Sequence, residues 1–157
     1  VKEGGYPSLL KMFLGTTTGT IGETSTAALL LGAIYLLLRR VIDWKIPVIY
    51  IATFAVFDIL YMVIAGAAAY PLLYELCGGG LMLGAFFMAT DYVTSPITSK
   101  GKVIYAILLG LLTGLFRFFG ESAEGVSFAI IIGNLFVPLI ERYTVPKAFG
   151  KEGKANG

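Results

Sequence analysis

Five apolar stretches divide the chain, separated by short segments richer in polar, charged or small residues. They cover Thr26–Leu38, Ile46–Ala65, Pro71–Thr90, Val103–Phe119 and Val126–Ile140. A helix that crosses a hydrocarbon core of ~30 Å needs roughly 20 residues. The second and third stretches reach that length and the fourth nearly does, whereas the first and fifth are short. The short ones cross a membrane only if the preceding segments, 15–25 and 120–125, also lie at membrane depth.

This pattern predicts an all-α fold, a polytopic membrane helix bundle of about five transmembrane segments, some short or broken. We expect residues 1–25 to form an outward-facing lead-in, 26–143 the bundle and 144–157 a cytoplasmic tail. Three consecutive glycines, Gly78–Gly80, lie inside the third stretch. Glycine destabilises a helix interior and brings no side chain, so a helix break or very close packing is expected there.

A pattern of small and acidic residues near the first stretch recurs near the fifth. Gly19, Glu23, Ala28 and Gly32 match Gly120, Glu124, Ala129 and Gly133. Short hydrophobic segments with similar starts in corresponding positions are typical of transporter folds, which place a binding site between internal repeats. The chain is therefore expected to form half of an inverted or pseudo-repeat fold. Chance similarity between two apolar helices is the alternative.

Composition and charge agree with a membrane protein. Hydrophobic residues make up 57% of the chain and charged residues only 14%, whereas a soluble domain has about 25% charged residues. Basic residues favour cytoplasmic loops, which places the first and third connections and the C-terminus inside and the N-terminal lead-in outside. The basic residues that give this orientation are Arg39, Arg40, Lys45, Lys100, Lys102, Arg142, Lys147, Lys151 and Lys154.

Several function classes are excluded by what the sequence lacks. There is no His, the commonest general base and metal ligand, and one Cys cannot form an internal disulfide. The net charge of +2 is too small for a nucleic-acid binder. No phosphate-binding glycine loop of the Walker or dinucleotide type occurs. The sequence therefore argues against hydrolysis, NAD binding and nucleic-acid binding within this chain.

The first candidate site is the polar segment that precedes the first apolar stretch. Gly22, Glu23, Thr24 and Ser25 combine a flexible backbone with good helix-start residues. A helix that begins inside the membrane presents unpaired N–H groups and a positive dipole end, which hold anionic or polar ligand groups. We predict that these four residues bind a cofactor. The alternative is an ordinary helix cap in which Glu23 stabilises the first turn.

The second candidate site is Asp91, at the expected cytoplasmic end of the third stretch. Hydroxyl groups flank it, and Pro96 prevents the helix from continuing. Because oxygen-rich groups suit a hard cation such as Na⁺, Asp91 is the candidate cation ligand. From the chemistry alone, a polar helix exit into a turn is the better explanation.

Other polar residues lie within the apolar stretches, where a charge costs about 2.5–3.5 kcal/mol or more. Asp58 is expected to be either a protonated packing residue or part of an ion path. Arg117 is expected to form a local ion pair with Glu121 or Glu124. Asn134 is expected to bond a neighbouring helix.

Three motifs resemble those of a known family. Gly19–Ser25 is similar to its G-x-I-G-E-T-S segment, Gly79–Pro96 to G-G-L…A-F-F-M-A-T-D-P-V-T-S-P, and Glu124–Asn134 to E-G-V-x-F-A-I-L-I-G-N. The family is the D subunit of the Rnf electron-transport complex, with the B subunit of the sodium-pumping NADH:quinone oxidoreductase as its relative. The resemblance covers about residues 13 to 143. Tyr92 stands where the family usually has Pro.

The resemblance implies a protein of the bacterial or archaeal cytoplasmic membrane, with the lipid bilayer and other Rnf subunits as partners. The family's members carry FMN on a Thr of an outer-face S-G-A-T motif, and riboflavin is a further candidate cofactor. That motif is absent here, since Thr18–Ile21 lacks the required Ala and Thr. We therefore expect the chain to be the C-terminal half of such a subunit, with the flavin threonine upstream of Val1.

The implied function is flavin-mediated electron transfer, coupled to Na⁺ or H⁺ translocation, in an ion-translocating ferredoxin:NAD⁺ oxidoreductase. The chain would not be catalytic alone. A transporter or channel half without a redox cofactor is the alternative, and a purely structural scaffold is a third hypothesis. Carboxylate and hydroxyl oxygens suit Na⁺ and H⁺ equally well, so the sequence does not identify the coupling ion.

Overall fold

The computed structural model describes residues 9–16, 24–65, 72–78, 80–120 and 125–146, and these contain helices and no strand. The all-α prediction is therefore confirmed for the described part of the chain. Its elements are α1 (Leu9–Leu14), α2 (Thr26–Leu38), α3 (Lys45–Ala65), α4 (Leu72–Cys77), α5 (Leu81–Leu83), the π-helical η1 (Gly84–Met88), α6 (Ser99–Phe119) and α7 (Gly125–Thr144).

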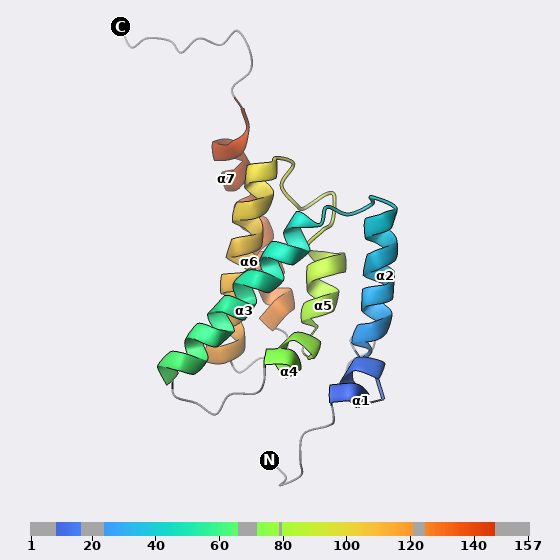
Figure 1. Ribbon diagram of the computed structural model, residues 1–157. Helices are drawn as coiled ribbons and strands as arrows, with labels where there is room; N and C mark the ends of the chain where they lie inside the picture. The colour runs from blue at the N-terminus through green and yellow to red at the C-terminus, as the bar shows by residue number, and fades with distance from the viewer. Residues whose placement is uncertain (1–8, 17–23, 66–71, 79, 121–124, 147–157) are drawn as a thin grey trace, which may run out of the picture.

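The bundle is organised around α6, which packs against both α3 and α7. In Figure 1, α3 crosses in front of α6, α7 lies behind it, and α5 lies between α3 and α2. Fully buried side chains form the centre of the core, and the large ones include Tyr50 and Phe54 of α3, Leu81 of α5, and Tyr105 and Leu109 of α6. Burial of these large side chains fixes α3 and α6 against the broken third stretch.

Among the described residues, three helices, α3, α6 and α7, are long and apolar enough to cross a membrane, by length and composition. The fourth and fifth stretches are longer as helices than as apolar runs. In particular, α7 reaches 20 residues by continuing through Glu141 to Thr144. By contrast, α2 has 13 residues, because Ser25 caps its first turn and the chain before it is not helical at Thr24.

The third apolar stretch is broken at its glycines, as predicted. Helix α4 ends at Cys77, and Gly80 has a left-handed φ of 70° before α5 begins. Farther on, the Ala89 N–H donates to the Gly84 carbonyl at 2.8 Å, five residues back, which defines the π-helical turn. The stretch therefore enters the bundle as short pieces, and its interruption leaves backbone groups of α4 without helical partners.

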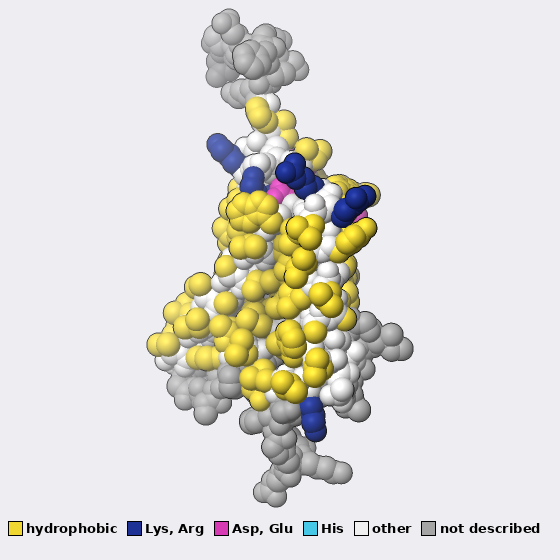
Figure 2. Space-filling view, turned by 45° about the vertical axis from the view of Figure 1, so that its right-hand side comes forward, with side chains coloured by type: hydrophobic (Ala, Val, Ile, Leu, Met, Phe, Trp, Pro, Cys, Tyr) yellow, Lys and Arg dark blue, Asp and Glu magenta, His cyan; other side chains and the backbone are white. Residues whose placement is uncertain are grey.

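Basic side chains gather at one end of the molecule. Figure 2 shows most of the dark blue Lys and Arg side chains near the end that carries the C-terminal segment, above a broad hydrophobic surface. We call this the basic end, and its residues follow α2, begin α3 and α6, and end α7: Arg39, Arg40, Lys45, Lys100, Lys102 and Arg142. The clustering agrees with the sequence prediction that the first and third connections and the C-terminus lie on one side of the membrane. Which membrane side this end faces stays a prediction.

Candidate functional site

The beginning of α2 is a capped helix start. Gly22 and Glu23 lie outside the described residues. The Ser25 hydroxyl accepts a hydrogen bond from the Ala28 N–H at 3.3 Å and donates to the Phe13 carbonyl at 3.5 Å. Ser25 therefore performs the capping role expected in the alternative interpretation. The cofactor-binding assignment of Gly22–Ser25 is not tested by these contacts and stays a prediction.

The next residue joins this start to the break in the third stretch. Thr26 is buried, and its hydroxyl donates to the carbonyl of Cys77, the last residue of α4, at 3.3 Å. The two interrupted helices, far apart in sequence, thus meet end to end. Sequence reasoning identified both breaks but missed their contact, because nothing local to either segment indicates the other.

Arg117 provides ion-pair and hydrogen-bond partners for the C-terminal end of α4, where the third stretch is interrupted. Its Nε lies 2.8 Å from Oε2 of Glu75, while its terminal nitrogens donate to the carbonyls of Glu75 and Gly78, each at 2.8 Å. The guanidinium also lies 5.4 Å from the centroid of the Phe54 ring. The Arg117 side chain therefore neutralises the Glu75 carboxylate and donates hydrogen bonds to carbonyls that the helix break leaves without helical partners. It also contacts a core aromatic ring of α3.

This arrangement differs from the local ion pair expected for Arg117. In the described part of the chain its carboxylate partner is Glu75, on another element, whereas Glu121 and Glu124 lie outside the described residues. The signal that could have identified Glu75 was its position just before the three glycines. An acidic side chain and unpaired carbonyls at one helix end together form a binding site for a long basic side chain such as Arg.

Asp58 completes a group that we call the buried cluster: Asp58 of α3, with Glu75 of α4 and Arg117 of α6, whose side chains are largely buried, at 17% and 20% exposure. The Asp58 side chain is fully buried, at 0% exposure, and within the described structure neither carboxylate oxygen has a hydrogen-bond partner. It lies within electrostatic range of both other members. Since Tyr50, Phe54 and Asp58 recur every four residues and are all buried, they share the face of α3 that packs on α6.

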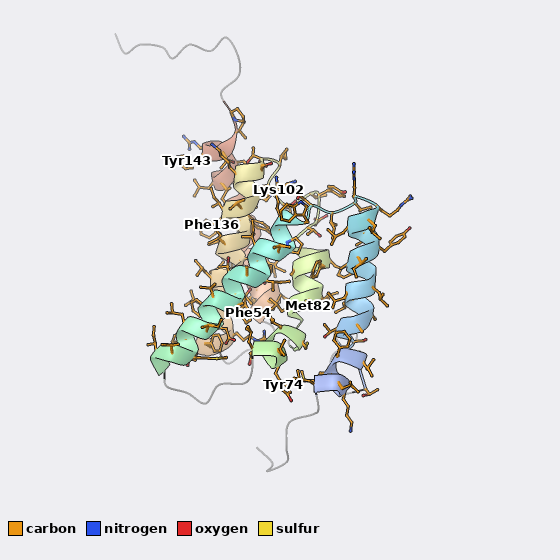
Figure 3. All side chains as sticks on the ribbon, in the orientation of Figure 1. Phe54, Tyr74, Met82, Lys102, Phe136 and Tyr143 are labelled. Carbon is orange, nitrogen blue, oxygen red and sulfur yellow. The ribbon has the colours of Figure 1, made fainter. Side chains whose placement is uncertain are left out.

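Figure 3 helps to locate the buried cluster along the bundle. Lys102 marks the basic end, Phe54 lies along α3, and Tyr74 marks α4 near the opposite end. Because Arg117 contacts both the Phe54 ring and the end of α4, the cluster lies between the levels of these two labelled residues. It is thus inside the bundle and displaced away from the basic end.

Two further polar contacts cross between the long helices. The Tyr50 and Thr113 hydroxyls of α3 and α6 are 2.5 Å apart, and the Tyr105 hydroxyl donates to Oδ1 of Asn134 on α7 at 2.5 Å. The expectation that Asn134 bonds a neighbouring helix is therefore confirmed. Such bonds satisfy polar groups that would otherwise be unpaired in hydrocarbon.

Asp91 lies in the exposed turn that follows η1. Its Oδ2 accepts a hydrogen bond from the Thr94 hydroxyl at 3.2 Å, and its carbonyl accepts from the Ser95 N–H at 3.0 Å. Across the described ranges, no three His, Cys, Asp or Glu side chains come together in a way that could hold a metal. These contacts describe a polar turn. The cation-ligand assignment of Asp91 is untested and stays a prediction.

A cavity of ≈ 510 Å³ opens beside this turn at the basic end, with Arg40, Trp44, Thr90 and Tyr92 among its lining residues. Asp43 and Lys102 form an ion pair of 2.9 Å at its wall. Burial by itself raises the pKa of the Asp43 carboxyl, but hydrogen bonds from Lys102 and the Lys45 N–H, with both lysine charges, outweigh it. The pKa of Asp43 is therefore lowered from its ordinary value.

The family model and similar curated proteins indicate the same family for this chain. The NQR2, RnfD, RnfE family matches residues 2–150. The chain is 45% identical, over 97% of its length, to the D subunit of the Na(+)-translocating ferredoxin:NAD(+) oxidoreductase complex of Acetobacterium woodii, covering 48% of that protein. It is 45% identical over 94% of its length to the D subunit of the proton-translocating ferredoxin:NAD(+) oxidoreductase complex of Clostridium ljungdahlii, covering 45% of it.

A third relative comes from Stutzerimonas stutzeri. This D subunit of an ion-translocating oxidoreductase complex is 41% identical over 96% of the present chain, which covers 42% of that protein. The chain thus spans about half the length of the curated relatives it matches. The matched region, residues 2–150, includes every described helix.

Proposed function

The chain belongs to the NQR2, RnfD, RnfE family, and from this premise we propose that it forms part of the D subunit of an ion-translocating ferredoxin:NAD⁺ oxidoreductase complex. The observation that carries the proposal is 45% identity over nearly the whole chain to a protein so named. The chain supplies membrane helices to the complex and is not catalytic alone. Other subunits of the same complex are its proposed partners.

The proposed place of the chain is the bacterial or archaeal cytoplasmic membrane. As a multi-pass membrane protein it buries α3, α6 and α7 in the bilayer. The basic end supports an orientation with the C-terminus in the cytoplasm, because Lys and Arg are retained on that side during insertion. The beginning of α2 lies at the other end of that helix, which directs it toward the outer face.

We propose FMN as the cofactor, attached to a threonine upstream of Val1, and riboflavin as a second candidate. Bound flavin would supply electron transfer. Within the chain, the start of α2 supports the proposal, since the positive end of a helix dipole suits a phosphate group. Thr24 and Ser25 would border that group from this helix end, while Ser25 also keeps α2 capped.

Covalent flavin on the full-length subunit is the direct test. The protein is purified under denaturing conditions and examined for flavin fluorescence, with and without substitution of the threonine in an upstream S-G-A-T motif. Retained fluorescence that disappears in the variant supports the proposal. Absence of both the motif and the flavin from the intact polypeptide would contradict it.

A transporter or channel without a redox cofactor is the second candidate, and the joined helix breaks at Thr26 and Cys77 favour it. Interrupted helices at a common level are typical of solute and ion sites in transporters. An ion-flux measurement in reconstituted vesicles distinguishes the two candidate functions. Ion flux through the full-length subunit without ferredoxin, NAD⁺ or partner proteins would support the transporter, and flux only in the complete, reduced complex would support the redox-driven pump.

A further inference from the structure

No cation in the described residues is available to pair with the Asp58 carboxyl group alone. In the buried cluster, Arg117 already pairs with the Glu75 carboxylate at 2.8 Å and donates to two backbone carbonyls. One positive and one negative charge cancel, so an ionised Asp58 would leave a net negative charge inside the bundle. A buried charge without a partner is strongly unfavourable, and neutralisation of the group is the usual outcome.

The elements packed against this part of α3 supply no second cation in their described residues. Helix α6 contributes Arg117 and the Thr113 hydroxyl, the latter bonded to Tyr50 of α3. Helix α4 contributes Glu75, and the segment Leu81–Met88 of α5 and η1 contains no titratable side chain. Lys45 and Lys102 lie at the basic end, where Lys102 pairs with Asp43 and Lys45 donates to Ser99.

The surroundings of Asp58 also discriminate between a proton and a metal cation. A hard metal cation requires several oxygen ligands. Neither Asp58 oxygen has a hydrogen-bond partner among the described residues, and the carbonyls of Glu75 and Gly78 are engaged by Arg117. A proton needs only one carboxyl oxygen, and it restores neutrality without further ligands.

We propose that Asp58 is a proton-binding site within the membrane part of the bundle and carries a proton in the described conformation. On release, the O–H bond breaks, the electron pair stays on the carboxylate and the proton passes to water. Arg117 lies within electrostatic range of both acids, so the new carboxylate would share that one positive charge with Glu75. The proposal requires that the helices lie in a membrane, as the family assignment implies, but does not depend on the electron-transfer function proposed above.

Dicyclohexylcarbodiimide provides the first test, because it adds to protonated carboxyl groups in apolar surroundings and rearranges to a stable N-acylurea. Membranes containing the full-length protein are treated with this reagent, and the digested protein is analysed by mass spectrometry. We expect modification of Asp58, falling as pH rises, and none of the ion-paired Glu75. Na⁺ in place of choline at equal ionic strength should leave the rate unchanged.

Matched variants define the outcomes. Asp58→Asn should abolish the label at that position, while Asp43→Asn, an acid at the other end of the α3 region, should leave labelling of Asp58 intact. Protection by Na⁺ would overturn the proposal in favour of a sodium site. Modification at Glu75 instead of Asp58 would overturn it by moving the proton to the other acid.

Infrared spectroscopy gives a second measurement that does not depend on access of the reagent. The difference spectrum of wild type minus Asp58→Asn should contain the carbonyl stretch of a protonated carboxyl group, and that of wild type minus Asp43→Asn should not at neutral pH. Absence of this band, or its replacement by carboxylate bands, would overturn the proposal. Neither measurement reads flavin content or turnover, so failure here and failure of the proposed function are distinguishable.

Discussion

At the scale of single residues, Arg117 and Glu75 are held inside the bundle by specific partners, whereas Asp58 has none among the described residues. Arg117 is the clearest case, since one guanidinium contacts a carboxylate and two carbonyls that the break after α4 leaves available. A charge held this way is stabilising only while its partners remain, because desolvation has already removed its water. Removal of one partner should therefore cost far more than removal of both.

Glu75→Gln should lower the free energy of unfolding of the full-length protein by roughly 3 kcal/mol, because Arg117 would lose its ion pair while remaining largely buried. The measurement is thermal or denaturant unfolding in detergent. The double variant Glu75→Gln with Arg117→Met should lose less than the sum of the single variants, as expected for directly coupled residues. Equal stability of Glu75→Gln and wild type would show that the ion pair contributes nothing.

The Asp43–Lys102 pair gives a prediction that depends on pH. The folded-state pKa of Asp43 is lowered, so its stabilisation is present above the unfolded-state pKa and is lost as pH falls through the folded-state value. Asp43→Asn should therefore cost about 0.5–1 kcal/mol near neutral pH and nothing in acid. Unfolding curves of both proteins across pH test this, and a constant difference would contradict it.

At the scale of elements, glycine allows the long helices to approach one another. A Cβ at Gly110 of α6 would lie 2.6 Å from the Thr53 Cβ and 3.0 Å from the Tyr50 carbonyl oxygen on α3. At Gly133 of α7, a Cβ would lie 2.4 Å from a Leu109 methyl group. Small residues at such crossings provide close backbone packing where lipid tails offer no hydrophobic driving force.

Gly110→Ala should separate α3 from α6 and lower the free energy of unfolding by about 1–3 kcal/mol, since backbone atoms cannot move aside cheaply. Gly32→Ala is the matched control in another helix. Its Cβ would meet only the outer edge of the Phe87 ring at 3.1 Å, so we expect a change below about 1 kcal/mol. Unfolding in detergent compares the two, and equal losses would rule out helix approach as the reason.

At the scale of the whole molecule, the separation of charge defines an orientation. The basic end collects residues from two connections and from the end of α7, whereas α1, which contains Lys11, lies toward the opposite end (Figure 1). Retention of Lys and Arg on the cytoplasmic side during insertion turns this asymmetry into a membrane topology. The membrane orientation is set by the distribution of Lys and Arg over all the loops together, and no single helix determines it.

Accessibility of single cysteines tests this orientation in the full-length protein. In a Cys77→Ser background, Lys100→Cys at the basic end should react with a membrane-impermeant maleimide only in inverted vesicles. Thr16→Cys, which is exposed beyond α1, should react only in right-side-out vesicles. The reversed pattern would place the basic end outside and contradict the proposed topology.

Local features of the sequence determined much of this protein. Apolar runs and the scarcity of charge predicted the helices and the membrane environment, and Gly78–Gly80 predicted the interruption of the third stretch. Asn134 was expected to bond a neighbouring helix because amides in hydrocarbon must find a partner. Each of these inferences depends on backbone propensity or solvation, which act over a few residues and can be judged from sequence.

Only the tertiary structure decided which distant groups meet. Arg117 was expected to pair with acids nearby in the sequence. In the described structure its carboxylate partner is Glu75, which lies 42 residues earlier in the chain. The isolation of Asp58 likewise became apparent only when its neighbours were placed. The physical reason is that the cost of a buried charge depends on every group around it, and helix packing brings those groups from separate parts of the chain.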